Sequence, residues 1–347
     1  MIKSYKYLIS CHIMLHKHVM QFFDRIEFES GPFQNIFFEP DFIDIVNRHP
    51  RIVREPLIEI YNILKRLNQP TRSLIIQQIR DSNKILEICE GSIAPVKLDN
   101  SVSGLKKVLR DFFIKLYNQV LDGNGFNDKY NTTLREHFNG FRKLNRNITL
   151  CPTCGIGELK MSESKTRDQY DHFLPKALYP FSSVNFENLV LSCKECNSPD
   201  AKGEKDTLGV SSGYIFYPFN FNHQQLTVAF NIIKDNSNPE DIIWNINYTS
   251  PELKNNEITS WKNIYDIDIR YKDFVKGRVE KWYRFYWEFM NDNDLSHIPE
   301  NDRKISCLKA LEIDEKLQLS FIRKPVLDGF LRDSIMARAE IEARLYV

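Results

Sequence analysis

Two Cys-x-x-Cys pairs are the residues in this chain best suited to hold a metal ion. Cys151 and Cys154 form the first pair, and Cys193 and Cys196 form the second. Each such turn supplies two thiolates, and four thiolates complete the tetrahedral coordination that zinc prefers. Because four thiolates leave no position open for water or substrate, the spacing predicts a structural zinc ion that joins the ends of the 155–192 segment. The alternative is a set of buried or redox-active cysteines that pair only in sequence.

Between and beside these pairs lie residues that could activate water next to a hard cation. Asp171 offers a carboxylate oxygen suited to Mg2+ or Mn2+, and His172 points the other way if both lie in an extended strand. Asn197 could supply a second metal ligand, and Asn188 could bind backbone groups and orient His172. Phosphodiester hydrolysis needs such a base and such a cation, so the set predicts a hydrolytic site. Taken singly, each residue would more often be a surface, turn or capping residue.

These motifs together resemble the HNH, or ββα-metal, endonucleases that contain a zinc site. The resemblance implies that His172 is the general base. It further implies that Asp171 and Asn197 bind the catalytic Mg2+ or Mn2+, and that Asn188 is the central asparagine of the motif. The matching stretches are Cys-Pro-Thr-Cys-Gly at 151–155, Asp-His-Phe-Leu-Pro-Lys at 171–176, Glu-Asn-Leu-Val-Leu-Ser-Cys at 187–193 and Cys-Asn-Ser…Lys-Gly at 196–203.

Two further stretches resemble proteins of bacterial defence. The phrase Asp-His-Phe-Leu-Pro-Lys, followed by Tyr179 and Pro180, is similar to the HNH component of Septu-type anti-phage systems, which accompanies an ATPase. Ser-Trp-Lys-Asn from Ser260, together with Arg270 and Tyr271, resembles more weakly the helical tail of HNH proteins from anti-phage systems. The resemblance therefore implies an ATPase partner subunit.

One departure from the family pattern concerns phosphate binding. Lys176 and Lys202 are candidate phosphate contacts, with solvated surface lysines as the alternative. Three residues, Pro199–Ala201, are inserted between Cys-Asn-Ser and Lys-Gly. Because proline is excluded from helix interiors, the insertion bears on the positions of Asn197 and Lys202.

The elements that would position these residues divide the chain into three parts. We predict a helical region at 1–147, an HNH module with the four-cysteine zinc site at 148–210, and a region at 211–347 that is first mixed β and then helical. Within the module we expect short strands over 169–174 and 184–191 and a short helix over 194–202. The sequence therefore predicts an α+β fold: a mostly helical protein with an embedded zinc-stapled ββα-metal module.

Charge along the chain bears on how nucleic acid would be held. The net charge of +1 gives no global basic field, and residues 150–210 contain seven basic and nine acidic side chains. Residues 101–147 contain nine basic side chains against four acidic ones, which indicates either solvated helix faces or a phosphate-contacting surface. We expect that stretch, the basic residues at 270–278 and a divalent cation to supply the attraction.

Cysteine usage and hydrophobicity indicate the compartment. Seven cysteines without secretory features favour a reducing environment. The sequence before Cys11 resembles a lipoprotein cleavage box, but the apolar run after Lys6 is shorter than the roughly 7–15 residues that a signal needs. No run approaches the ~20 apolar residues of a membrane span. We therefore predict a cytoplasmic protein without a membrane partner, in which His12, His16 and His18 lie at the surface.

The favoured hypothesis is a metal-dependent HNH endonuclease that cleaves nucleic acid, with DNA favoured, as the effector of a bacterial anti-phage system. One alternative is a zinc-stabilised nucleic-acid-binding or scaffolding module without catalysis. Another is a ribonuclease that acts on tRNA through the same residues. Contacts to the phosphate backbone do not distinguish DNA from RNA, so both alternatives stay open at this point.

Overall fold

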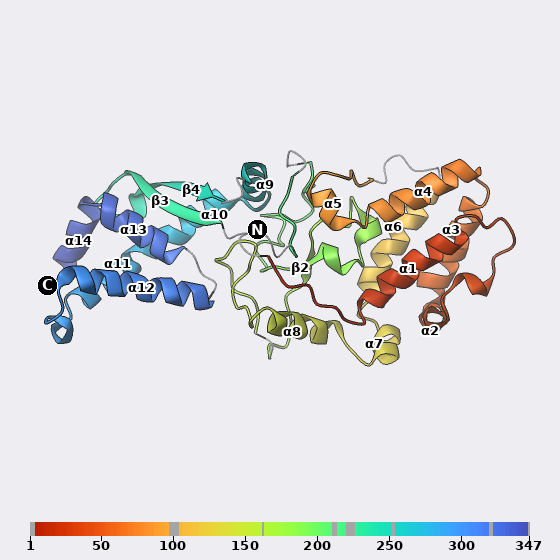
Figure 1. Ribbon diagram of the computed structural model, residues 1–347, viewed down its shortest axis with the longest axis horizontal. Coiled ribbons are helices and arrows are strands. Elements are labelled where there is room, and N and C mark those ends of the chain that lie inside the picture. The colour runs from red at the N-terminus through yellow and green to blue at the C-terminus, as the bar shows by residue number, and fades with distance from the viewer. Residues whose placement is uncertain are drawn as a thin grey trace.

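Helices form both ends of an elongated molecule, and a short β hairpin lies between them (Figure 1). The computed structural model describes residues 4–96, 104–161, 163–209, 214–219, 226–250, 254–318 and 322–345. The mostly helical α+β fold expected from the sequence is confirmed. Among the described helices, none combines the length and hydrophobicity that a membrane crossing requires.

The N-terminal end is a helical body around an aromatic core. Phe23 and Phe113 are fully buried and stack with ring centroids 6.0 Å apart. Local signals set several helix starts: Pro56 lies in the first turn of α3, and the Asn68 side chain caps α4. The helices are α1 (Ile13–Ile26), α2 (Pro40–Arg48), α3 (Glu55–Leu64), α4 (Gln69–Asp81), α5 (Ile85–Cys89), α6 (Leu105–Lys115), α7 (Asn124–Tyr130) and α8 (Leu134–Leu144).

The histidines near the N-terminus correct one expectation. His12 and His18 are buried, with exposed fractions of 1% and 3%, and His16 is half-buried. His18 stacks on Phe42 at 5.3 Å, and His16 Nε2 lies 2.9 Å from the side-chain oxygen of Asn83. These rings belong to the packing of α1, because neutral imidazole has both an apolar face and a polar edge that the core can satisfy.

The central hairpin is short and antiparallel. β1 (Tyr170–His172) pairs with β2 (Leu189–Leu191), and Asp171 lies opposite Val190. Both strands are shorter than predicted, and a 3-10 turn at Phe186–Asn188 occupies part of the range predicted for the second strand.

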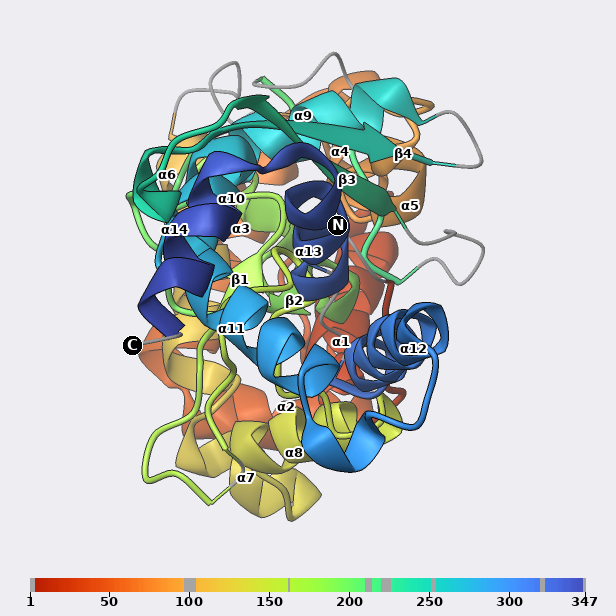
Figure 2. The ribbon, with the colours of Figure 1, turned by 90° about the vertical axis from the view of Figure 1, so that its left-hand side faces the viewer.

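The C-terminal end combines a two-stranded sheet with helices (Figure 2). The sheet packs closely on α13, where a Cβ on Gly329 would lie 2.1 Å from the carbonyl oxygen of Phe230. The elements are β3 (Thr227–Lys234), β4 (Ile243–Thr249), α9 (Asn255–Tyr265), α10 (Ile267–Lys276), α11 (Val279–Met290), α12 (Glu300–Gln318), α13 (Arg323–Asp333) and α14 (Met336–Leu345).

The segment after the second cysteine pair differs from the predicted ββα order. Residues 194–204 form successive turns, and no helix covers 194–202. Pro199 and Asp200 are exposed in the inserted stretch, and Gly203 adopts a positive φ of 46°. A proline and a left-handed glycine within eleven residues prevent a regular helix, so turns carry Asn197 and Lys202.

Candidate zinc centre and hydrolytic site

The four cysteines of the two pairs come together in one buried cluster. Cys151 and Cys196 have sulfur atoms 3.9 Å apart, and Cys154 and Cys193 have sulfur atoms 3.8 Å apart. All four sulfurs lie within 4.8 Å of one another. A tetrahedron with zinc–sulfur bonds of about 2.3 Å has sulfur–sulfur edges of about 3.8 Å, so the cluster fits a structural zinc ion.

The first cysteine pair lies in a tight backbone turn that leaves room for the sulfurs. Gly155 has a φ of 69°, and its N–H donates to the carbonyl of Cys151. Gly157 approaches the cluster so closely that a Cβ there would lie 2.4 Å from the sulfur of Cys193. The cluster therefore favours glycine at both positions: Gly155 for its positive φ and Gly157 for its close approach to a sulfur atom.

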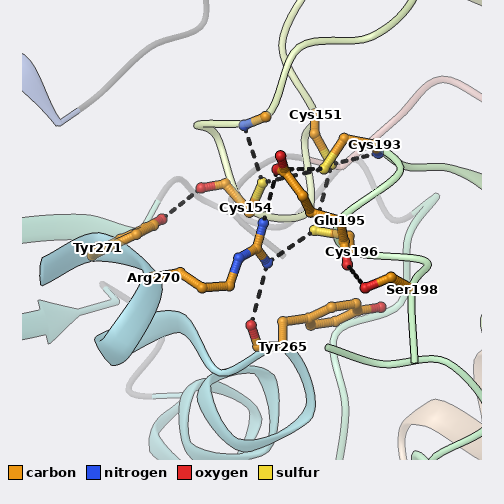
Figure 3. A network of polar contacts seen from close by, with 10 residues as sticks. Cys151, Cys154, Cys193, Glu195, Cys196, Ser198, Tyr265, Arg270 and Tyr271 are labelled. Atoms are coloured by element: carbon orange, nitrogen blue, oxygen red, sulfur yellow. Dashed lines mark hydrogen bonds and ion pairs between the residues drawn. The ribbon is translucent and has the colours of Figure 1, made fainter. Parts of the chain in front are cut away.

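Hydrogen bonds and charge around the sulfurs favour thiolates (Figure 3). Backbone N–H groups of Gly157 and Cys193 donate to the sulfurs of Cys154 and Cys151, at 3.4 and 3.3 Å. Burial raises the pKa of Cys151, whereas hydrogen bonds from the neighbouring thiols lower the pKa of Cys154. Four buried sulfurs cannot all ionise without a compensating cation, which is what a divalent metal supplies.

Three side chains from the C-terminal helices hold the cluster from one side. Trp261 Nε1 donates to the carbonyl of Thr153 at 2.7 Å, and the Tyr271 hydroxyl donates to the carbonyl of Cys154 at 2.8 Å. Arg270 donates to the sulfur of Cys196 at 3.3 Å. Although burial opposes it, the thiolates of Cys196 and Cys154 raise the pKa of Arg270.

These contacts give the Ser-Trp-Lys-Asn and Arg-Tyr stretches a structural place that the sequence did not predict. The sequence marks these stretches only by a resemblance, and it marks Arg270 only as one of several cations that could attract nucleic acid. Arg270 instead lies against the cysteine cluster, with its guanidinium 3.7 Å from the carboxylate of Glu195. Spacing alone gives no signal for this, because the helices that carry the side chains follow the second cysteine pair by about 60 residues.

Asn188 fastens the loop that joins the two hairpin strands. Its side-chain oxygen accepts from the backbone N–H of Leu174 at 2.6 Å, and its Nδ2 donates to the carbonyl of the same residue at 3.0 Å. Nδ2 also lies 3.1 Å from the hydroxyl of Ser182. Asn188 is completely buried, so it fixes the backbone just after His172 and contacts no ring nitrogen of that histidine.

His172 is held in one defined state. Its Nε2 lies 3.0 Å from the carbonyl oxygen of Ser183, which can only accept, so Nε2 carries the proton. Burial, reinforced by the positive charge of Lys176, lowers the pKa of His172 to about 3. The ring is therefore neutral near pH 7, and Nδ1 keeps a lone pair with no hydrogen-bond partner among the described residues. The Tyr117 ring packs edge-on against it at 4.3 Å.

Asp171 faces a lysine in the interior. Lys202 Nζ lies 2.6 Å from Asp171 Oδ1 and 2.7 Å from the carbonyl of His172, and both charged side chains are 1% exposed. Asp171 Oδ2 is buried without a hydrogen-bond partner in the described part of the chain. Burial raises the pKa of Asp171, and Lys202 opposes that rise. An acceptor atom left over in this way fits a second cation.

The remaining site residues lie nearer to solvent. The side chain of Asn197 is half-buried and makes no hydrogen bond to another described residue, which leaves its amide oxygen open. Lys176 is half-buried; its Nζ lies 2.8 Å from the side-chain oxygen of Asn118 and 4.5 Å from the Tyr117 ring centre. Lys202, in contrast, is buried on Asp171, so a phosphate could reach it only after that ion pair opens.

Three of the nine basic side chains at 101–147 are engaged with the protein itself. Lys129 lies 2.9 Å from a carboxylate oxygen of Asp44. Arg135 donates to the carbonyl of Ser164, and Arg142 donates to the carbonyl of Lys160. The two arginines fasten the loop between the first cysteine pair and β1, so the net charge of this stretch overstates the number of cations that are free to contact phosphate.

Comparison with known proteins gives one partial relative. A 54-residue stretch is 41% identical to the Septu protein PtuB of Bacillus thuringiensis. It covers 16% of this chain and 20% of that protein, so the similarity is local. No family model matches the chain, and no solved structure matches it.

Proposed function

We propose that this chain is a metal-dependent HNH endonuclease that hydrolyses phosphodiester bonds of nucleic acid. The observation that carries the proposal is the state of His172, whose Nε2–H is fixed on the Ser183 carbonyl while Nδ1 is free to accept a proton. A neutral, oriented imidazole is what a general base requires. The resemblance of the surrounding sequence to HNH nucleases adds to this support.

In the proposed reaction, His172 Nδ1 takes a proton from a water molecule as the water oxygen attacks phosphorus. The bond between phosphorus and the 3′ oxygen then breaks, and the products carry 5′-phosphate and 3′-hydroxyl ends. Asp171 and Asn197 are the residues that would hold Mg2+ or Mn2+, since Asp171 Oδ2 and the Asn197 amide are acceptors without partners. When bound, the cation would neutralise charge on the phosphate and on the leaving oxygen.

We propose that Asn188 positions the segment after His172 and does not itself contact the reacting atoms. Its hydrogen bonds hold the backbone of Leu174, two residues beyond His172, and we propose that this fixes the position of the His172 imidazole. Lys176 is proposed to approach a substrate phosphate, because it is half-buried beside Tyr117 and near His172. The zinc cluster keeps these groups together, because it joins the segments before and after the hairpin.

The biological role that we propose is nuclease effector in anti-phage defence. The local match to the Septu protein PtuB supports it. A defence complex would also supply a partner subunit, for which an ATPase is our proposal, and that partner could provide nucleic-acid contacts that the acidic 150–210 segment lacks. A cytoplasmic location follows from this role.

A digestion panel tests the proposal. Zinc-loaded protein is incubated with plasmid, single-stranded DNA and total RNA, with Mg2+ or Mn2+, and with or without the co-encoded ATPase. We expect cleavage that requires the added cation, with DNA cut in preference to RNA. Preferential cutting of tRNA would favour the ribonuclease alternative.

The non-catalytic alternative is favoured by two specific observations. The buried Lys202–Asp171 ion pair and the missing helix over 194–202 depart from what a metal-binding ββα site would lead one to expect. Tight nucleic-acid binding without nicking under any cation in the same panel would support a zinc-stabilised binding module instead.

A further inference from the structure

A hollow lined by cations and aromatic rings lies on the C-terminal helices. Its volume is about 520 Å³, and it opens between α11 and the start of α13. That volume falls within the roughly 300–1,000 Å³ typical of ligand sites. Neither the cysteine cluster nor the hairpin contributes to it. The lining residues are Arg278, Lys281, Trp282, Arg284, Phe285, Glu288 and Arg323.

Most of the positive charge in this hollow is not neutralised. Arg284 pairs with Glu280 at 2.9 Å. Arg278, Lys281 and Arg323 form no ion pair with any residue that the structure describes, and Glu288 is the single carboxylate in the lining. Arg323 Nε is also buried without a hydrogen-bond partner in the described ranges. Arg278 donates to the carbonyl of Phe274 at 3.2 Å, but its charge has no carboxylate partner among the described residues. Three cations without carboxylate partners around one hollow favour a polyanionic ligand.

The aromatic rings indicate which polyanion fits. Phe285 is 44% exposed, and the Arg323 guanidinium lies 4.6 Å from its ring centre. Trp282 is half-buried and packs against Phe274 at 6.0 Å. Exposed rings among cations suit unpaired bases, which stack on the rings while their phosphates contact the charges. An acidic peptide would satisfy the charges but offers no base to stack on the exposed part of the Phe285 ring beside Arg323.

We propose that this hollow binds a single-stranded segment of nucleic acid. Phosphates contact Arg278, Lys281 and Arg323, and a base stacks on Phe285. The inference deepens the proposed function, because it gives the substrate an anchor away from His172. It rests on nucleic acid being the substrate, but binding at the hollow requires no cleavage, so the two can fail separately.

The test measures binding by the full-length, zinc-loaded protein without added Mg2+ or Mn2+. Fluorescence anisotropy reports the affinity for labelled oligothymidylate and oligouridylate at low salt, and the two probes separate DNA from RNA. We expect Lys281→Glu to raise Kd about tenfold and to flatten the salt dependence by about 0.7 in log–log slope. Phe285→Ala, which keeps the charge, should raise Kd about fivefold or more.

A matched control separates the hollow from general charge. Lys304 on α12 is exposed, so Lys304→Glu makes the same change of charge outside the hollow and should leave Kd within about twofold of the wild type. Wild-type protein that binds neither oligonucleotide overturns the proposal, as do Lys281→Glu and Lys304→Glu with equal affinities. Competition by polyglutamate as strong as that by oligothymidylate also overturns it.

Discussion

His172 and Asp171 are adjacent in the sequence, but their side chains lie in different environments. The histidine donates a hydrogen bond from Nε2 to the carbonyl of Ser183 and stays neutral, with its pKa lowered to about 3 by burial. The aspartate pairs with a buried lysine, which opposes the rise in its pKa that burial causes. Alternation along a strand explains the difference, because successive side chains project to opposite faces.

Lys202 provides a prediction at this scale. Removing one member of a buried ion pair costs about 3–5 kcal/mol, since the other charge is left unpaired. Lys202→Met should therefore lower the free energy of unfolding by an amount in that range. If Asp171 binds a divalent cation, Mn2+ should restore part of the loss and raise Tm more in Lys202→Met than in the wild type. Thermal and urea unfolding, with and without Mn2+, measure both effects.

Lys205→Met is the matched control for that experiment. Lys205 pairs with Asp266 at 2.9 Å but is about one-third exposed, so its loss should cost roughly 0–1 kcal/mol and give no extra response to Mn2+. Equal Mn2+ shifts in all three proteins would argue against a cation site on Asp171.

At the scale of elements, the cysteine pairs and the hairpin could be predicted because each has a local signal. Cys-x-x-Cys turns have fixed spacing, and apolar runs mark both strands, although the turns before β2 shorten one of them. The predicted helix over 194–202 was wrong because Pro199 and the positive φ of Gly203 oppose it. The docking of Trp261 and Tyr271 on the first cysteine turn could not be predicted, since it depends on tertiary contacts between distant segments.

Arg270 gives the prediction for this scale. Its guanidinium lies against the sulfur of Cys196, where it would offset part of the negative charge that four thiolates place around a bound zinc ion. Arg270→Met should release zinc to a chelator about tenfold faster, a change in the range seen for residues that support metal ligands. A colorimetric zinc indicator follows the release. Arg278→Met is the control, because it removes an arginine that follows α10 and does not contact the cysteine cluster. We expect this variant to release zinc at the wild-type rate.

At the scale of the whole molecule, the buried apolar side chains of the N-terminal helices, the hairpin and the C-terminal helices form one continuous core, and α9 and α10 hold the first cysteine turn through Trp261 and Tyr271. Tyr5 also crosses to the hairpin, where its hydroxyl donates to the carbonyl of Leu191 at 2.7 Å. Sequence periodicity predicted helices at both ends but not these crossing contacts, which join residues 186 and 117 positions apart.

Zinc removal should therefore loosen the middle of the molecule before its ends. Chelation is expected to expose the 149–205 segment to limited proteolysis, while α1–α4 remain resistant because none of the four cysteines of the cluster lies on these helices. Mass spectrometry of the fragments locates the cuts. Cleavage that begins within α1–α4, or a pattern that zinc does not change, would contradict a structural role for the cluster.

The most direct test of the proposed function is cleavage by His172→Ala. Alanine removes Nδ1, the atom proposed to take the proton from water, so cleavage should fall by about 100-fold or more. Zinc content should stay at the wild-type level, since no cysteine contacts the ring. His18→Ala, which removes another buried histidine in α1, controls for lost packing and should retain cleavage in proportion to folded protein. Undiminished cutting by folded, zinc-loaded His172→Ala would contradict the assignment of His172 as the general base.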